Sequence, residues 1–377
     1  MMPDDVNPTE HMRLTTSERD LDALAGQLSE WLRDRVGADG PPVISDLQRP
    51  LSGGLSSASV LFDAHWKSGG RTEGGAFVAR MIPEEGAFPV FEKYDLGLQY
   101  RVITEIGAAT DVPVPRLRWL ETDSAACGAP FFVMDRVPGR IPGDNPPYVF
   151  AGWLYDATTA ERAELTRNTV DVLARIHALP DPAQRFPELD GPGPALRRHI
   201  ESDRAWYHWA LAGDGYEIPL IERAFDWLDR NFPDDPGPDV LSWGDARPGN
   251  IIYEGFAPVA VLDWEMAALG PRELDLAWMI FLHRFFQDIA TGFGFPGLPD
   301  FLRRDEVVAH YEKVSGHTVT DLDFYLTYAA LRHAIVMARI KRRMIHMGED
   351  TAPAERDDYI MHRATLEAML DGTYGWD

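Results

Sequence analysis

Two segments of the chain place acidic and amide side chains where a single ligand can meet them. In residues 243–250 (WGDARPGN), Asp245 and Asn250 lie five residues apart in a loop shaped by proline and glycine, and such a loop can present both side chains to one ligand. An expected strand pair follows, and it ends in acid at Asp263, within residues 261–265 (VLDWE). The spacing therefore predicts that these three side chains share one site.

The residue types in this set match what phosphoryl transfer requires. That reaction needs hard oxygen ligands for Mg²⁺, a carboxylate near the attacking hydroxyl and positive charge on the transferring phosphate. Asn250 and Asp263 are candidate metal ligands, Asp245 is the candidate for orienting or deprotonating the acceptor, and Arg247 is the candidate cation. Taken singly, Asp245 and Asn250 are better explained by an Asx turn. Jointly, their spacing and context favour phosphoryl transfer.

A glycine-rich segment lies much earlier, in residues 51–59 (LSGGLSSAS), between two expected strands. Backbone amides freed by glycines, together with nearby hydroxyl groups, can cradle phosphates. The candidates for this role are Ser52, Gly53, Gly54, Ser56 and Ser57. A plain hairpin turn is the alternative for a Gly-Gly pair between strands.

Before residue 138, short strand-like runs punctuated by glycine occur together with helical segments, which predicts a mixed structure of strands and helices. The apolar spacing predicts an amphipathic helix over 17–36, opened by a Ser17 cap, and another helix over 90–106. A β-hairpin is predicted from strands at 59–66 and 76–82, with a turn over 67–75. Two further strands of the same antiparallel sheet are predicted at 116–121 and 131–137.

The pattern becomes mainly helical after the Pro/Gly-rich stretch 138–147. The expected helices cover 160–179, 194–211, 219–231, 273–286, 303–314, 321–347 and 354–371. One strand pair, 250–253 and 259–262, is embedded among them and carries Asn250 and the residues before Asp263.

Three motifs in order give this sequence a specific resemblance. Gly-Asp-x-x-x-x-Asn at 244–250, Asp-x-Glu at 263–265 and Asp-Leu-Ala at 275–277 resemble the aminoglycoside phosphotransferase and choline kinase group of small-molecule kinases. The resemblance implies a protein-kinase-like, bilobal α+β fold, with an N-terminal antiparallel sheet lobe and a larger, mainly helical C-terminal lobe. The expected domains are an N-terminal helical extension (1–42), a nucleotide-binding lobe (43–137) and a C-terminal lobe with the catalytic loop and acceptor site (138–377).

The resemblance also implies roles for individual residues. Arg80 takes the position of the basic residue that reaches the nucleotide phosphates, and Gln99 stands where relatives carry its glutamate partner. Met134, Asp135 and Val137 would lie along the nucleotide base. Glu265 either helps to hold a second metal ion or faces solvent, while Asp275 is implied to be a structural acid that braces the catalytic loop.

The co-substrate implied by the resemblance is ATP or GTP with Mg²⁺, and the acceptor is an alcohol. An aminoglycoside or other amino-alcohol is one expectation, which for aminoglycosides carries antibiotic resistance as the biological role, and a hydroxy-acyl metabolite is the alternative. The acceptor is expected among the helices after Pro194, beside Glu201, Asp203, Trp206, Tyr207, Trp209 and residues 321–347. Trp243, where the group has His, together with Arg80 and Gln99, motivates a further alternative, a nucleotide-binding pseudokinase that serves as an interaction module.

The composition and the missing motifs limit the expected partners, location and enzyme class of the protein. The formal net charge of −24 argues against binding to nucleic acid or an anionic membrane surface, and is compatible with a cationic acceptor. A single cysteine, Cys127, and the lack of an apolar leader favour a reducing, cytoplasmic location. Signatures of dinucleotide binding, of serine hydrolases and of zinc proteases are missing from the sequence.

Overall fold

The computed structural model describes residues 19–50, 58–84 and 88–376. The chain divides into two compact units. Among the described residues, unit 1 comprises 106–112 and 139–376, and unit 2 comprises 19–50, 58–84, 88–105 and 113–138. The domain boundaries expected from the sequence stay predictions.

Unit 2 is built on a five-stranded sheet in the order β1-β2-β3-β5-β4, with every neighbouring pair antiparallel. The strands are β1 (Val43–Gln48), β2 (Ala58–Ser68), β3 (Arg71–Met81), β4 (Leu117–Glu121) and β5 (Phe131–Asp135). The predicted hairpin is present, but its strands are longer and its turn shorter than the sequence suggested. Ser68 pairs with Arg71, and Gly69 and Gly70 between them both have positive φ, +55° and +79°, as a two-residue hairpin turn with the matching twist requires.

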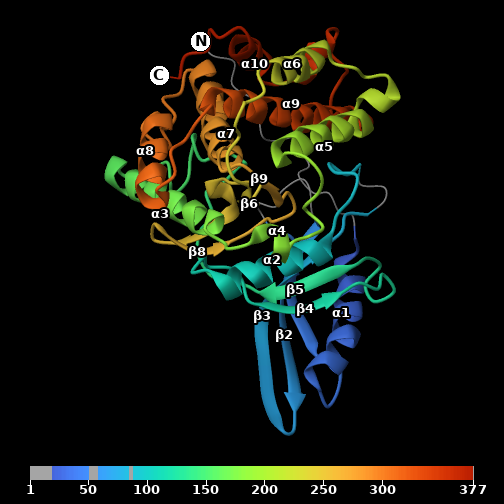
Figure 1. The fold of residues 1–377 in the computed structure, drawn as a ribbon. Coiled ribbons are helices and arrows are strands. Elements are labelled where there is room, and N and C mark those ends of the chain that lie inside the picture. Colours follow the sequence, from blue (N-terminus) through green and yellow to red (C-terminus); the bar gives the residue numbers. More distant parts are fainter. Residues whose placement is uncertain (1–18, 51–57, 85–87, 377) are drawn as a thin grey trace, which may run out of the picture. The chain divides into compact units, whose positions relative to one another are not determined.

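Helix α1 (Leu21–Val36) belongs to the core of unit 2 (Figure 1). Its buried side chains Leu24, Leu28 and Leu32 pack in one hydrophobic cluster with side chains from the sheet. Asp20 caps the helix by accepting from the amide of Asp22 at 2.9 Å, whereas the predicted cap Ser17 lies outside the described residues.

Helix α2 (Leu96–Ala109) begins six residues later than the predicted 90–106. The Asp95 carboxylate accepts from the amide of Leu98 at 2.8 Å. This side-chain bond satisfies one of the otherwise unpaired amides of the first turn and sets the start of the helix.

Unit 1 is mainly helical. Its α-helices are α3 (Thr159–His177), α4 (Pro182–Arg185), α5 (Ala195–Ala210), α6 (Pro219–Arg230), α7 (Glu273–Gly292), α8 (Arg304–Ser315), α9 (Leu322–His346) and α10 (Arg363–Leu370). The long helix α9 packs against α5, α6, α7 and α10 (Figure 1). The single helix predicted over 354–371 is wrong: the segment forms a short 3₁₀ turn, η4 (Arg356–Tyr359), and then α10. Between them His362 is buried and hydrogen-bonded to the Ala330 carbonyl at 2.9 Å, which anchors the break.

Two small antiparallel strand pairs carry the motifs in unit 1. β6 (Val240–Ser242) pairs with β9 (Ala268–Gly270), and β7 (Ile251–Glu254) pairs with β8 (Ala257–Val261). A 3₁₀ turn, η3 (Pro248–Asn250), leads into β7. Across the described residues, no helix has the length and apolar character needed to cross a membrane.

Candidate active site

The β7–β8 hairpin brings Asn250 next to the acid that follows β8. Ile251 pairs with Val261, and one step further the amide of Leu262 donates to the carbonyl oxygen of Asn250 at 2.8 Å. Asp263 is the next residue. The pairing register thus gathers two side chains that are 13 positions apart in the sequence.

The Asp245 carboxylate is fixed by three donors. Its Oδ2 accepts from Asn250 Nδ2 at 2.6 Å and from Arg247 Nε at 3.1 Å. Its Oδ1 accepts from the indole Nε1 of Trp278, on α7, at 2.7 Å. The sequence-predicted residues Asp245, Arg247 and Asn250 therefore form one hydrogen-bonded group, with Trp278 as an additional member.

Arg247 lies between two carboxylates. Besides Asp245, its Nη1 donates to Oδ2 of Asp144 at 2.5 Å. Burial by itself would lower the pKa of this guanidinium, but the charges and hydrogen bonds of Asp144 and Asp245 outweigh burial and raise it above its ordinary value. Arg247 remains a cation, and its assignment to the transferring phosphate stays a prediction.

Asp275 braces the start of the catalytic loop, as the resemblance implied. Its two carboxylate oxygens accept from the hydroxyl of Ser242 at 2.9 Å, from the amides of Trp243 and Gly244 at 2.7 and 2.8 Å, and stand 3.0 Å from His177 Nε2. Burial raises the pKa of this carboxyl, but the His177 contact and the two amides outweigh it, so the pKa lies below its usual range. The brace therefore keeps its negative charge inside the protein.

Trp243 fixes the backbone around Asp263. Asp263 has φ of +59°, a left-handed conformation that costs a side-chain-bearing residue on the order of 1 kcal/mol. The fully buried indole of Trp243 donates to the carbonyl oxygens of Leu262 and Asp263 at 2.9 and 3.2 Å. Trp243, at the position where the resemblance implies a His, thus has a structural task in this chain.

The donor set around the hairpin fits Mg²⁺. Both hydrogen bonds of the Asn250 carboxamide use its nitrogen, so the amide oxygen is the atom suited to a cation, and Asp263 contributes a carboxylate. Mg²⁺ takes few protein ligands and completes its shell with water and phosphate oxygens. Within the described residues no three His, Cys, Asp or Glu side chains form a self-contained metal cluster. Glu265 lies in the turn after Asp263, and its metal role stays a prediction.

Unit 2 holds the residues predicted to contact the nucleotide. Arg80 on β3 and Gln99 on α2 are both buried, and Arg80 Nε donates to Gln99 Oε1 at 3.0 Å. Gln99, at the position where the resemblance implies a Glu, therefore contacts Arg80 through a hydrogen bond. The glycine-rich segment, with Ser52, Gly53, Gly54, Ser56 and Ser57, falls outside the described residues.

The proposed base-binding strand ends at Asp135. The backbone amides of Asp135 and Arg136 already donate to carbonyl groups within unit 2, at 2.9 Å each. Contacts of Met134, Asp135 and Val137 with a base stay predictions.

Sequence reasoning missed Trp278 and Asp144. Trp278 lies three residues after Asp275, so both face the same side of α7, and this spacing was the available signal. Nothing in the sequence pairs Asp144, from the Pro/Gly-rich stretch, with Arg247 103 positions later. Of the expected acceptor residues, Asp203 and Tyr207 are buried, whereas Glu201 is exposed.

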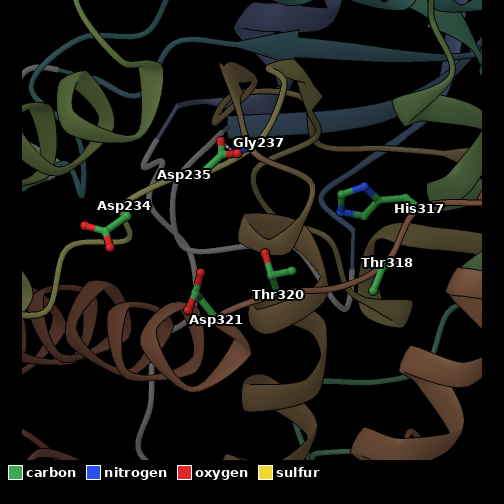
Figure 2. A pocket seen from close by; sticks show the side chains of 7 residues that line it. All are labelled: Asp234, Asp235, Gly237, His317, Thr318, Thr320 and Asp321. Carbon is green, nitrogen blue, oxygen red and sulfur yellow. Dashed lines mark hydrogen bonds between the residues drawn. The ribbon is translucent and has the colours of Figure 1, made fainter.

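A cavity of about 480 Å³ in unit 1 is separate from this group. Figure 2 shows its lining residues: Asp234, Asp235, Gly237, His317, Thr318, Thr320 and Asp321. None of the residues around Asp245 contributes to it. His317 is held instead by Glu273, at 2.7 Å between Nε2 and Oε1, so we assign the cavity no part in the active site.

The family model of the phosphotransferase enzymes matches residues 48–316, a segment that contains all the motifs described above. The chain belongs to the phosphotransferase enzyme family. It is an enzyme of the small-molecule kinase type. The expected family and activity class are thereby confirmed.

Curated relatives of this phosphotransferase are much longer proteins. The chain is 28% identical over 308 residues to acyl-CoA dehydrogenase family member 11 of Gallus gallus, covering 79% of this chain and 38% of the relative. It is 24% identical over 291 residues to acyl-CoA dehydrogenase family member 10 of Mus musculus, covering 74% of this chain and 25% of the relative. This phosphotransferase thus spans about a third of the length of such relatives.

Solved structures with the same fold include a candidate aminoglycoside phosphotransferase from Ralstonia eutropha, with a TM-score of 0.60, 22% identity and coverage of 95% of this chain and 97% of that one. Another is the aminoglycoside phosphotransferase APH(4)-Ia in a ternary complex with AMP-PNP and hygromycin B, with a TM-score of 0.55, 16% identity and coverage of 93% and 99%. These likenesses confirm the protein-kinase-like α+β fold of the phosphotransferase.

Proposed function

We propose that this phosphotransferase moves the γ-phosphate of ATP or GTP, bound with Mg²⁺, onto the hydroxyl group of a hydroxyacyl thioester. The observation that carries the acceptor is the similarity, over about three quarters of the chain, to proteins named acyl-CoA dehydrogenases. The matched part accounts for a minority of those proteins, so a phosphotransferase-like segment there shares a polypeptide with a further segment. Activities joined in one polypeptide commonly serve related substrates, which favours an acyl thioester with a hydroxyl group.

The residues of the catalytic loop have the following proposed roles. Asp245 orients the acceptor hydroxyl and takes its proton, while Asn250 and Asp263 hold the Mg²⁺ ion and Glu265 helps to hold a second metal ion. When bound, the ion supplies neutralising charge for the phosphate oxygens. Arg247, held between Asp144 and Asp245, adds positive charge on the protein side of the transferring group.

The nucleotide side of the proposal uses unit 2. Arg80, positioned by Gln99, contacts the nucleotide phosphates, together with the segment of Ser52, Gly53, Gly54, Ser56 and Ser57. The backbone beyond β5, at Val137, contacts the base. The complete set of Asp245, Asn250 and Asp263 supports turnover over a role as a pseudokinase.

The test is a transfer assay with MgATP and MgGTP against hydroxyacyl-coenzyme A thioesters carrying the hydroxyl at carbon 2, 3 or 4. An increase of 80 Da in one acceptor, seen by mass spectrometry, is the expected result. Asp245→Asn should lower kcat at least about 1,000-fold, because the proton acceptor is lost, while nucleotide affinity stays within a few-fold. Undiminished transfer by this variant would remove Asp245 from the mechanism.

A cationic amino-alcohol is the second candidate acceptor, favoured by the net charge of −24 and by the fold shared with aminoglycoside kinases. Hygromycin B and other aminoglycosides therefore form the second arm of the same assay. Phosphorylation of an aminoglycoside, with every thioester unmodified, would replace the first acceptor by the second.

A further inference from the structure

The hydrogen bonds of Asp245 leave a single position for an incoming hydroxyl group. An ionised carboxylate offers about four acceptor positions, two on each oxygen. Oδ2 uses both of its positions on Asn250 Nδ2 and Arg247 Nε, at 2.6 and 3.1 Å. Oδ1 uses one on Trp278 Nε1, at 2.7 Å. Counting the described residues only, the open position is the second one on Oδ1, beside the indole.

The indole of Trp278 packs against the side chain of Arg332. The guanidinium of Arg332, on α9, lies 4.9 Å from the centre of the Trp278 ring, close enough for a cation–π attraction. Arg332 is itself buried and stands with Nε 2.9 Å from Oδ2 of Asp203, on α5. Tyr328 donates to the same Asp203 oxygen at 2.6 Å.

This arrangement links three helices to the catalytic carboxylate. Asp203 from α5 fixes Arg332 from α9, Arg332 packs on Trp278 from α7, and Trp278 donates to Asp245. All four side chains belong to unit 1. Asp203 is one of the residues expected beside the acceptor. This series of contacts therefore connects a predicted acceptor-site residue with the carboxylate of Asp245.

We propose that Trp278, supported by Arg332, is a positioning residue that fixes the rotamer of Asp245 and directs the acceptor hydroxyl to Oδ1. The inference rests on the proposed function. In the transfer step, the acceptor oxygen forms a bond to the γ-phosphorus, and its proton passes to Oδ1 of Asp245. The bond from the γ-phosphorus to the bridging oxygen breaks, and its electron pair leaves with the nucleoside diphosphate. Trp278 takes no atom in this step; it holds the accepting oxygen in place.

The kinetic test compares Trp278→Phe with the wild-type protein, using MgATP and the hydroxyacyl-coenzyme A thioester that the wild type phosphorylates. Phenylalanine keeps an aromatic ring against Arg332 but removes the N–H donor. We expect kcat to fall about 10- to 100-fold, the range for a small misplacement of a catalytic group. The KM for MgATP should stay within about twofold, because the nucleotide is not held by Asp245. Equal kcat values would overturn the proposal.

Trp31 provides the matched control. Its indole Nε1 also donates to a carboxylate, Oε2 of Glu121, at 2.8 Å, but this pair belongs to unit 2 and has no assigned part in the reaction. Trp31→Phe should lower the unfolding midpoint without the loss of kcat. An equal loss of kcat in both variants, at equal loss of stability, would assign Trp278 a merely structural role.

A spectroscopic test separates this inference from the proposed function. In an indole ¹H–¹⁵N spectrum, the Trp278 signal is identified by its loss in Trp278→Phe. Asp245→Asn replaces a charged acceptor by a neutral amide, so we expect the Trp278 signal to move upfield while the Trp31 signal stays in place. An unmoved Trp278 signal overturns the inference even if transfer is observed. If no acceptor is phosphorylated but the signal moves, the proposed function fails and the contact stands.

Discussion

In unit 1 the buried carboxylate of Asp275 is surrounded by four donors, whereas in unit 2 the carboxylate of Glu121 bonds at the rim of a sheet. Asp275 accepts from two backbone amides and a hydroxyl and contacts His177, with its side chain 1% exposed. Glu121 accepts from Trp31 and from the amide of Asp123, at 2.8 and 2.9 Å, and forms an ion pair with Arg35; its side chain is 13% exposed. Water can replace part of what Glu121 loses on substitution, but not what Asp275 loses.

Asp275 also differs from Asp245, the proposed catalytic residue, although both carboxylates accept several hydrogen bonds. Asp275 uses its oxygens on the protein itself and holds the loop in place. Asp245 has one acceptor position on Oδ1 that none of the described residues fills, and its side chain is 16% exposed. In the proposed mechanism, this open position receives the acceptor hydroxyl, whereas the occupied positions of Asp275 hold the loop in place.

The largest effect on stability is expected from Asp275→Asn. The amide group turns a donor toward groups that are themselves donors, so the free energy of unfolding should fall by roughly 3–5 kcal/mol. Urea denaturation followed by far-UV circular dichroism measures this loss. The control, Glu121→Gln in unit 2, should lose about 1 kcal/mol or less. Similar losses in the two variants would contradict the contrast between the two carboxylates.

The two units should also respond differently to mild acid. Unit 1 contains buried imidazoles, and burial lowers the pKa of His199, His283 and His362 to about 4 each. Burial lowers the pKa of His333 as well, with help from the charges of His362 and Arg247. Unit 2 contains only His65, which is exposed.

The sign follows from which state binds the proton. Between pH 6.5 and 4, an imidazole of the unfolded chain takes up a proton, whereas these buried imidazoles stay neutral. The free energy of unfolding is therefore not reduced by them above about pH 6.5, and it falls as the pH drops toward 4. Calorimetry at pH 7.0, 5.5 and 4.5, with hydrogen exchange to assign the transitions, should show that the unfolding temperature of unit 1 falls before that of unit 2. A parallel decline of both units would contradict this assignment.

The smallest effect is expected from Gln99→Glu in unit 2. The change converts the bond from Arg80 into a charge-assisted one, which should raise the stability of unit 2 by roughly 1 kcal/mol. Thermal unfolding monitored by hydrogen exchange in peptides of β3 and α2 measures the gain. Nucleotide affinity should change less than about tenfold; a larger loss would mean that the new carboxylate withdraws the charge of Arg80 from the phosphates.

The local elements were largely predictable from the sequence, and their ends were not. Apolar periodicity indicated α1, α3, α5 and α9. Short strand-like runs separated by glycine indicated the sheet of unit 2. The start of α2 depends on a hydrogen bond from the Leu98 amide to Asp95, and the break before α10 depends on His362 bonding to Ala330. Such bonds compete with simple periodicity, so a pattern of apolar residues does not reveal them.

The sequence by itself determined the family, the fold class and the identity of the group around Asp245, Asn250 and Asp263, because these residues lie in short motifs joined by one hairpin. Only the tertiary structure decided what holds them. Trp278, Asp144 and Arg332 reach the site from α7, a distant loop and α9. Their contacts arise from packing across large sequence separations. The spacing of Trp278 from Asp275 indicates the face of α7 on which the indole lies, but not that this indole donates to Asp245, and no spacing pairs Asp144 with Arg247.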